Sequence, residues 1–181
     1  GLGDVYKRQR LHWIKDDGLD DPSDLCAHSP VIMEINKEMI VSPDDGDWTV
    51  SASSLLLLRS IFRDHKGDME DEEHIFPCCG HFIIPNEDRE VHITGCPNGI
   101  DFSIIHMESD IELKFEAKTF RVSKTEWCNT VIEFSDKVQK FYRSSQSKIL
   151  DDDFEREGFE QMMNEWSSLR KQAEQVGAVD G

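Results

Sequence analysis

Residues 102–122 read FSIIHMESDIELKFEAKTFRV, and this stretch predicts consecutive antiparallel strands. Apolar Ile111, Leu113 and Phe115 alternate with charged residues, as on a strand with one face buried. The segments 102–107 and 120–122 flank that strand, and the connections between the three are short. Short connections favour antiparallel pairing, so the stretch predicts a β meander.

Further strands are expected toward the N-terminus. Segments 82–84 and 90–93 extend the predicted meander, and segments 31–35 and 38–41 predict an earlier hairpin. Its two-residue loop, Asn36-Lys37, suits a tight turn because Asn tolerates positive φ. Between hairpin and meander, Ser51 is a candidate N-cap for a helix running to about Arg63. That helix is apolar nearly all round, so we expect it to be buried on more than one side.

Two helices are expected after the meander. Ser123 and Glu126 have the spacing of a capping box, and the second helix is expected to start near Asp152 or Asp153. Each helix has one apolar face, formed by Trp127, Val131, Phe134, Val138 and Phe141 and by Phe159, Met162, Met163, Trp166 and Leu169. The predicted fold class is α+β: an N-terminal β-hairpin and helix, an antiparallel β meander, and two C-terminal helices packed on the sheet.

The length of 181 residues suits one domain, which we place at residues 10–175 with a tail at 176–181. Residues 1–9 resemble a translated sequencing-adapter scar and are left out of the fold prediction. Hydrophobic residues make up 38% of the chain, which is enough for a core. The longest apolar run is Leu55–Leu58, far too short to span a bilayer, so no membrane association is expected.

The chain is strongly acidic. Asp and Glu number 37 against 20 Lys and Arg, giving a net charge of −17, which argues against a nucleic-acid partner. The excess is concentrated in residues 16–24, 44–47, 64–74 and 151–160. These segments are either solvated loops or parts of one negative face for a basic protein partner. For the second case, the expected site consists of Asp44, Asp45, Asp47, Trp48, Asp68, Glu70, Asp71, Glu72 and Glu73, with Trp48 as an aromatic anchor.

Two Cys-x-His pairs are candidate metal ligands: Cys26 with His28, and Cys79 with His81. Residues two apart on an extended segment point to the same side, so each pair offers a sulfur and an imidazole to zinc. Cys78 and Cys96 are further candidates. The alternatives are ordinary buried thiols, or a cysteine-dependent enzyme with Cys79 as nucleophile.

Five sequence strings, at 24–29, 77–82, 95–102, 134–142 and 164–166, resemble those of a family of small bacterial cytosolic proteins of unknown function. In size and acidity that family is similar to immunity proteins of polymorphic toxin systems. The resemblance implies a cytoplasmic inhibitor of a basic toxin and assigns no functional residue. The chain also lacks the Walker lysine, Gly-x-Gly-x-x-Gly and Gly-x-Ser-x-Gly motifs, which favours a non-enzymatic role.

Overall fold

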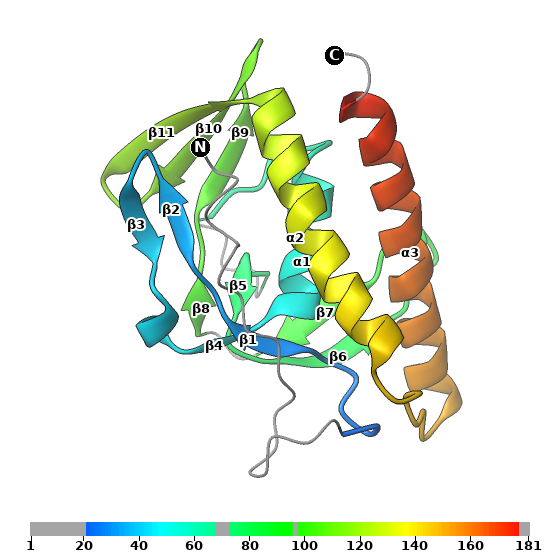
Figure 1. Cartoon of the computed structure of the whole chain (residues 1–181). Helices are drawn as coiled ribbons and strands as arrows, with labels where there is room; N and C mark the ends of the chain where they lie inside the picture. The colour runs from blue at the N-terminus through cyan, green and yellow to red at the C-terminus, as the bar shows by residue number, and fades with distance from the viewer. Residues whose placement is uncertain (1–20, 68–72, 96–97, 178–181) are drawn as a thin grey trace.

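The computed structural model describes residues 21–67, 73–95 and 98–177 and has the expected α+β fold (Figure 1). Three α-helices lie in these ranges: α1 (Val50–Ser60), α2 (Lys124–Ser144) and α3 (Asp153–Gly177). Short antiparallel strands pair in small separate sheets rather than in one large sheet. The proposed scar at 1–9 lies outside the described residues, and α3 includes Val176 and Gly177, which the sequence reading assigned to the tail.

Helix α1 is the centre of the molecule, because every one of its residues is buried. It packs against both α2 and α3, which confirms the expectation of burial on more than one side. Its predicted bounds were wrong at both ends. The helix begins at Val50 after Thr49, and the hydroxyl of Ser51 accepts a hydrogen bond from the backbone N–H of Ala27 instead of capping the helix.

The N-terminal hairpin is confirmed as β2 (Met33–Ile35) and β3 (Glu38–Val41). Its loop residues Asn36 and Lys37 have φ values of 53° and 70°. Two consecutive left-handed residues are typical of the type I′ turn, whose twist matches that of the paired strands.

The meander is confirmed for its last three strands, β9 (Ser103–His106), β10 (Asp110–Phe115) and β11 (Lys118–Ser123), which pair in chain order. Within the described residues, the strands between α1 and β9 do not join this sheet but form two separate pairs. Strands β6 (Gly80–Ile84) and β7 (His92–Gly95) form a separate hairpin, and β5 (Phe76–Pro77) pairs with β8 (Gly99–Ile100). Strands of two residues have too little alternation for the sequence to reveal them.

Helices α2 and α3 lie side by side over α1 (Figure 1). Each extends one buried indole: Trp127 Nε1 donates to Ser60 Oγ of α1 over 3.1 Å, and Trp166 Nε1 donates to Ser135 Oγ of α2 over 2.6 Å. Contacts with strands are made by α2 to β10 and β11, and by α3 to β6. The C-terminal helices therefore pack on strands, as expected, and equally on α1.

One strand pair positions the candidate site. Strand β1 (His28–Pro30) pairs antiparallel with β4 (Asp47–Thr49), with His28 opposite Thr49. The 3₁₀ turn η2 (Pro43–Asp45) precedes β4. This pairing brings the segment before β1 against the start of α1, where Ala27 exchanges hydrogen bonds with Ser51.

Candidate functional site

Asp24, Cys26 and His28 form a compact group of metal-ligand type just before and within β1. One carboxylate oxygen, the sulfur and one ring nitrogen all lie within 4.8 Å of one another. Cys26 is 7% exposed and His28 is 3% exposed, so the group is largely shielded from solvent. Carboxylate, thiolate and imidazole are donors that zinc accepts, and the group could hold such an ion.

The backbone of this segment is held from several sides. The N–H of Cys26 donates to Asp24 Oδ1 over 2.9 Å, and the phenol of Tyr142 on α2 donates to the carbonyl of Leu25 over 2.7 Å. The next residue, Ala27, bonds to α1. Because neighbouring residues are each fixed by a different partner, the donor atoms are positioned before any ligand arrives.

The imidazole of His28 is oriented through both ring nitrogens. Its Nε2 lies 3.6 Å from Asp24 Oδ2, and its Nδ1 lies 3.4 Å from the hydroxyl of Thr49. A partner on one ring nitrogen orients the imidazole and leaves the other nitrogen to bind a metal. In His28 the nitrogen that faces the carboxylate of Asp24 is Nε2, so Nε2 is the nitrogen that would bind a metal.

Burial, and next the charge of Asp24, raises the pKa of the Cys26 thiol to about 12. The ligand-free thiol is therefore protonated at neutral pH. Lys148 acts in the opposite direction and lowers the pKa of Cys26, whereas the charge of Cys79 raises it. Burial, followed by the charge of Cys26, also raises the pKa of Tyr142 well above its usual value.

The structure brings together half of the predicted zinc ligands and adds one. Cys26 and His28 are adjacent as expected, and Asp24 completes the group. Asp24 was missed although it continues the same every-second-residue pattern. Cys79 is not a member of the 4.8 Å group. The side chain of His81 lies outside the described part of the chain, and Cys79 as a nucleophile stays a prediction.

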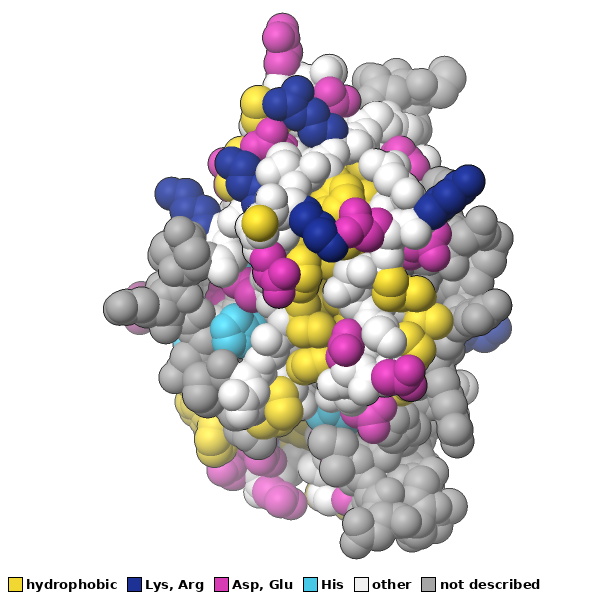
Figure 2. Space-filling view, turned by 90° about the vertical axis from the view of Figure 1, so that its left-hand side faces the viewer, with side chains coloured by type: hydrophobic (Ala, Val, Ile, Leu, Met, Phe, Trp, Pro, Cys, Tyr) yellow, Lys and Arg dark blue, Asp and Glu magenta, His cyan; other side chains and the backbone are white. Residues whose placement is uncertain are grey.

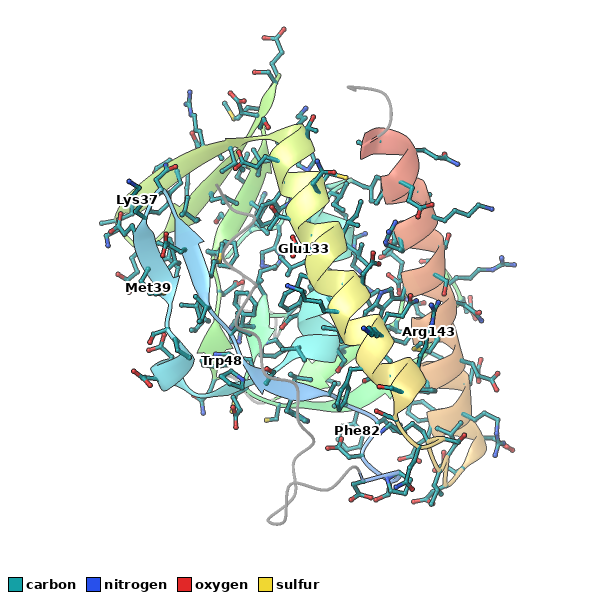
Figure 3. The ribbon with its side chains drawn as sticks, viewed as in Figure 1. Lys37, Met39, Trp48, Phe82, Glu133 and Arg143 are labelled. Carbon is teal, nitrogen blue, oxygen red and sulfur yellow. The ribbon has the colours of Figure 1, made fainter. Side chains whose placement is uncertain are left out.

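The acidic loop of the predicted partner site is exposed at Asp44, Asp45 and Asp47. The carboxylate of Asp45 stabilises its own turn, because it accepts a hydrogen bond from the N–H of Ser42 over 2.7 Å in a capping box. The expectation that Trp48 is a surface anchor is not met. Its side chain, on β4 (Figure 3), is only 9% exposed and belongs to the core.

The remaining predicted partner residues separate into two groups. Asp68, Glu70, Asp71 and Glu72 lie outside the described residues. Glu73 is described: it forms an ion pair with Arg59 at 3.6 Å, and its carboxylate lies 3.3 Å from Nδ1 of His92. On the face that carries the β2–β3 hairpin, hydrophobic side chains near the middle have both carboxylates and Lys or Arg side chains around them (Figure 2).

A groove of about 630 Å³ lies between α3 and the turn that joins β6 to β7. Its lining includes the carboxylates of Glu90, Asp153, Glu157, Glu160 and Glu165, with Arg89 and Arg156. Three of these carboxylates have arginine partners: Glu90 with Arg63, Asp153 with Arg156, and Glu165 with Arg59. Glu157 and Glu160 form no ion pair with the described residues, so the groove has surplus negative charge.

Beside this groove, helix α3 packs closely on the β6–β7 hairpin. A side chain on Gly158 of α3 would overlap the carbonyl oxygen of Ile83 in β6. Gln161 Oε1 accepts from the N–H of Asn86 over 2.7 Å, and its Nε2 donates to the carbonyl of the same residue. The groove walls are thus joined by direct contacts. The sequence marked residues 151–160 as acidic but gave no sign that the turn at 86–90 faces them.

Compared with known protein families, curated proteins and solved structures, the chain matches none. Among the described residues, no helix combines the length and apolar character needed to cross a membrane.

Proposed function

We propose that this protein binds a basic protein partner, in the manner of an immunity or inhibitor protein acting on a basic toxin. The observation that carries the proposal is the acidic groove on α3 in a chain of net charge −17. Opposite charge speeds encounter and orients the partner, and a groove selects an extended basic segment over a flat surface.

Glu157 and Glu160 are the residues that test this proposal, because both are exposed and neither is needed for an ion pair among the described residues. The probe is a fluorescently labelled oligolysine peptide, and its anisotropy is followed at rising NaCl concentration. We expect Glu157→Gln with Glu160→Gln to weaken binding about fivefold at low salt, since each exposed charge contributes well under about 1 kcal/mol. Affinity should fall as salt screens the charges.

The matched control is Glu108→Gln with Glu116→Gln, two exposed carboxylates in the turns on either side of β10. It removes the same charge from another part of the molecule and should change affinity less than about twofold. Equal losses in both double variants would show long-range attraction without a groove site, and affinity independent of salt would contradict the electrostatic mechanism.

A second candidate function is structural zinc binding by Asp24, Cys26 and His28. The observation that favours it is their donor atoms within 4.8 Å in a buried, hydrogen-bonded segment. Metal binding would stabilise the fold, because the unfolded chain has no such site. The test is elemental analysis of the protein purified without added metal, together with melting before and after chelation.

His28→Asn should abolish the bound zinc and the effect of the chelator on melting. His92→Asn, at a histidine whose side chain is 47% exposed, is the matched control and should retain both. Zinc far below one ion per chain, or melting that the chelator does not change, would exclude this function.

A further inference from the structure

A second groove, of about 550 Å³, lies between α2 and α3. Four cationic side chains line it, two from each helix: Lys140 and Arg143 of α2, and Arg170 and Lys171 of α3. Its lining also includes two carboxylates, those of Asp136 and Glu174. Helix α3 therefore borders two grooves whose lining charges have opposite signs.

Both carboxylates of this basic groove are engaged by one arginine. Arg170 Nε donates to Asp136 Oδ1 over 2.6 Å, and Arg170 Nη2 donates to Asp136 Oδ2 over 2.9 Å. The third guanidinium nitrogen, Nη1, lies 3.0 Å from Glu174 Oε1. Because Asp136 belongs to α2 and Arg170 to α3, this pairing joins the two walls of the groove.

The other three cations of the groove have no carboxylate partner among the described residues. Lys140, Arg143 and Lys171 are exposed and form no ion pair there. Arg143 projects from the last turn of α2 (Figure 3). In a chain of net charge −17, cations have many carboxylates to pair with, yet these three converge on one groove. Uncompensated charges that surround a groove raise the local concentration of ions of the opposite sign.

The groove suits a compact anion that carries several phosphate groups. Its volume is within the range of small-molecule sites, about 300–1,000 Å³. The guanidinium fork of Arg143 matches two phosphate oxygens, and a lysine ammonium binds phosphate as a point charge. A long polyanion such as a nucleic acid would have to cross the acidic remainder of the surface. A compact anion interacts mainly with charges inside the Debye length of about 8 Å.

We propose that the groove between α2 and α3 binds an oligophosphate through Lys140, Arg143 and Lys171. Arg170 is a positioning residue in this site, because its pairing with Asp136 holds the two helices, and so the cations on them, in a fixed arrangement. The sequence carries no phosphate-binding motif, since the contributing side chains come from two separate helices. The inference is independent of both proposed functions, because neither uses this groove.

The probe is inorganic triphosphate, titrated calorimetrically into the full chain at low ionic strength and without divalent cations, which would compete for the phosphates. We expect Arg143→Gln with Lys171→Gln, one exchange on each helix, to weaken binding about tenfold, because two of the three uncompensated cations are lost. The variant should melt at the temperature of the parent protein, since both side chains are exposed and unpaired among the described residues.

The matched control is Lys37→Gln with Lys66→Gln, two exposed lysines outside the groove. Lys37 lies in the loop of the β2–β3 hairpin, across the molecule from α3 (Figure 3). Both double variants change the net charge of the chain by the same amount, so a difference between them reports on the groove itself. The control should change the affinity for triphosphate less than about twofold.

Titrations with ATP and with adenosine identify the source of the phosphates. An affinity for ATP no higher than that for triphosphate assigns the site to the phosphate chain alone. Tighter binding of ATP, with weak binding of adenosine, assigns it to a nucleoside polyphosphate, and both results support the inference. A parent protein that does not bind triphosphate, or two double variants that bind it alike, would overturn it. So would tighter binding of a glutamate pentapeptide than of triphosphate, which would make the groove a surface for an acidic protein segment.

Discussion

At the scale of single residues, a buried ion pair joins Arg59 of α1 to Glu165 of α3. Arg59 Nε donates to Glu165 Oε1 over 2.7 Å and its Nη2 donates to the other carboxylate oxygen over 3.0 Å. The same carboxylate accepts the N–H of Val91, and the guanidinium also donates to the Val91 carbonyl. Burial lowers the pKa of Arg59, but the hydrogen bonds and charge of Glu165 raise it above its usual value.

Replacing Glu165 with Gln should lower the free energy of unfolding by about 3 kcal/mol, because the variant removes the buried, hydrogen-bonded carboxylate of Arg59 and leaves only the more exposed Glu73 at 3.6 Å. Urea unfolding measures the loss. The control is Glu90→Gln, which breaks the exposed pair with Arg63 and should cost less than about 1 kcal/mol. Similar losses in the two variants would mean that burial adds nothing to the Arg59 pair.

At the scale of elements, the caps of α1 and α2 differ in how far local sequence determines them. At α2 the hydroxyl of Ser123 accepts the N–H of Glu126 over 3.1 Å, as the spacing predicted. At α1 the expected cap, Ser51, is bonded to the remote residue Ala27, and Thr49 in the N-cap position makes no side-chain cap bond. A local signal was correct where no distant segment competed for the hydroxyl.

Ser123→Ala should therefore lower the free energy of unfolding by about 1 kcal/mol, through loss of one acceptor at the start of α2. Ser123→Asp retains an acceptor and should recover most of the stability. Thermal melting of the three proteins is the measurement. An alanine variant as stable as the parent would show that packing alone fixes the start of this helix.

The contrast between local signals and contacts with distant residues explains which elements and which site residues the sequence could predict. Strands β10 and β11 and the faces of α2 and α3 were predicted because their periodicity extends over several residues. The pairs β1–β4 and β5–β8 were not, because their strands have two or three residues each. Asp24 was missed as a ligand for a related reason: contacts with distant residues, such as those of Leu25 with Tyr142 and of Ala27 with Ser51, hold the segment that brings it beside Cys26 and His28.

At the scale of the whole molecule, the three helices and several small sheets within the described residues share one core. Trp166 is fully buried, bonds to Ser135 of α2 and meets the ring of Tyr142 edge-on at 6.2 Å. Its burial supports the expectation that the apolar face of α3 is core rather than a docking surface for a partner helix. Exposed apolar side chains lie elsewhere, for example at Phe82 of β6, which is 62% exposed.

Trp166→Ala should lower the free energy of unfolding by about 3–5 kcal/mol, because it leaves a large cavity between α2 and α3. Trp166→Phe removes the indole N–H but fills most of the space, and should lose clearly less. Calorimetric melting gives both values. If the alanine variant kept its melting temperature and lost affinity for the basic peptide, the face would be an interface.

The pairing of Arg59 with Glu165 across 106 residues has a consequence for synthesis on the ribosome. Helix α1 emerges from the exit tunnel long before Glu165, the buried one of the two carboxylates that pair with its arginine, and before the helices that cover its leucines. Until then the nascent chain exposes the most apolar segment of the protein, Leu55–Leu58. Because such long-range contacts form late, the core is complete only after α3 has been translated, and a chain stalled before Glu165 would be a substrate for chaperones.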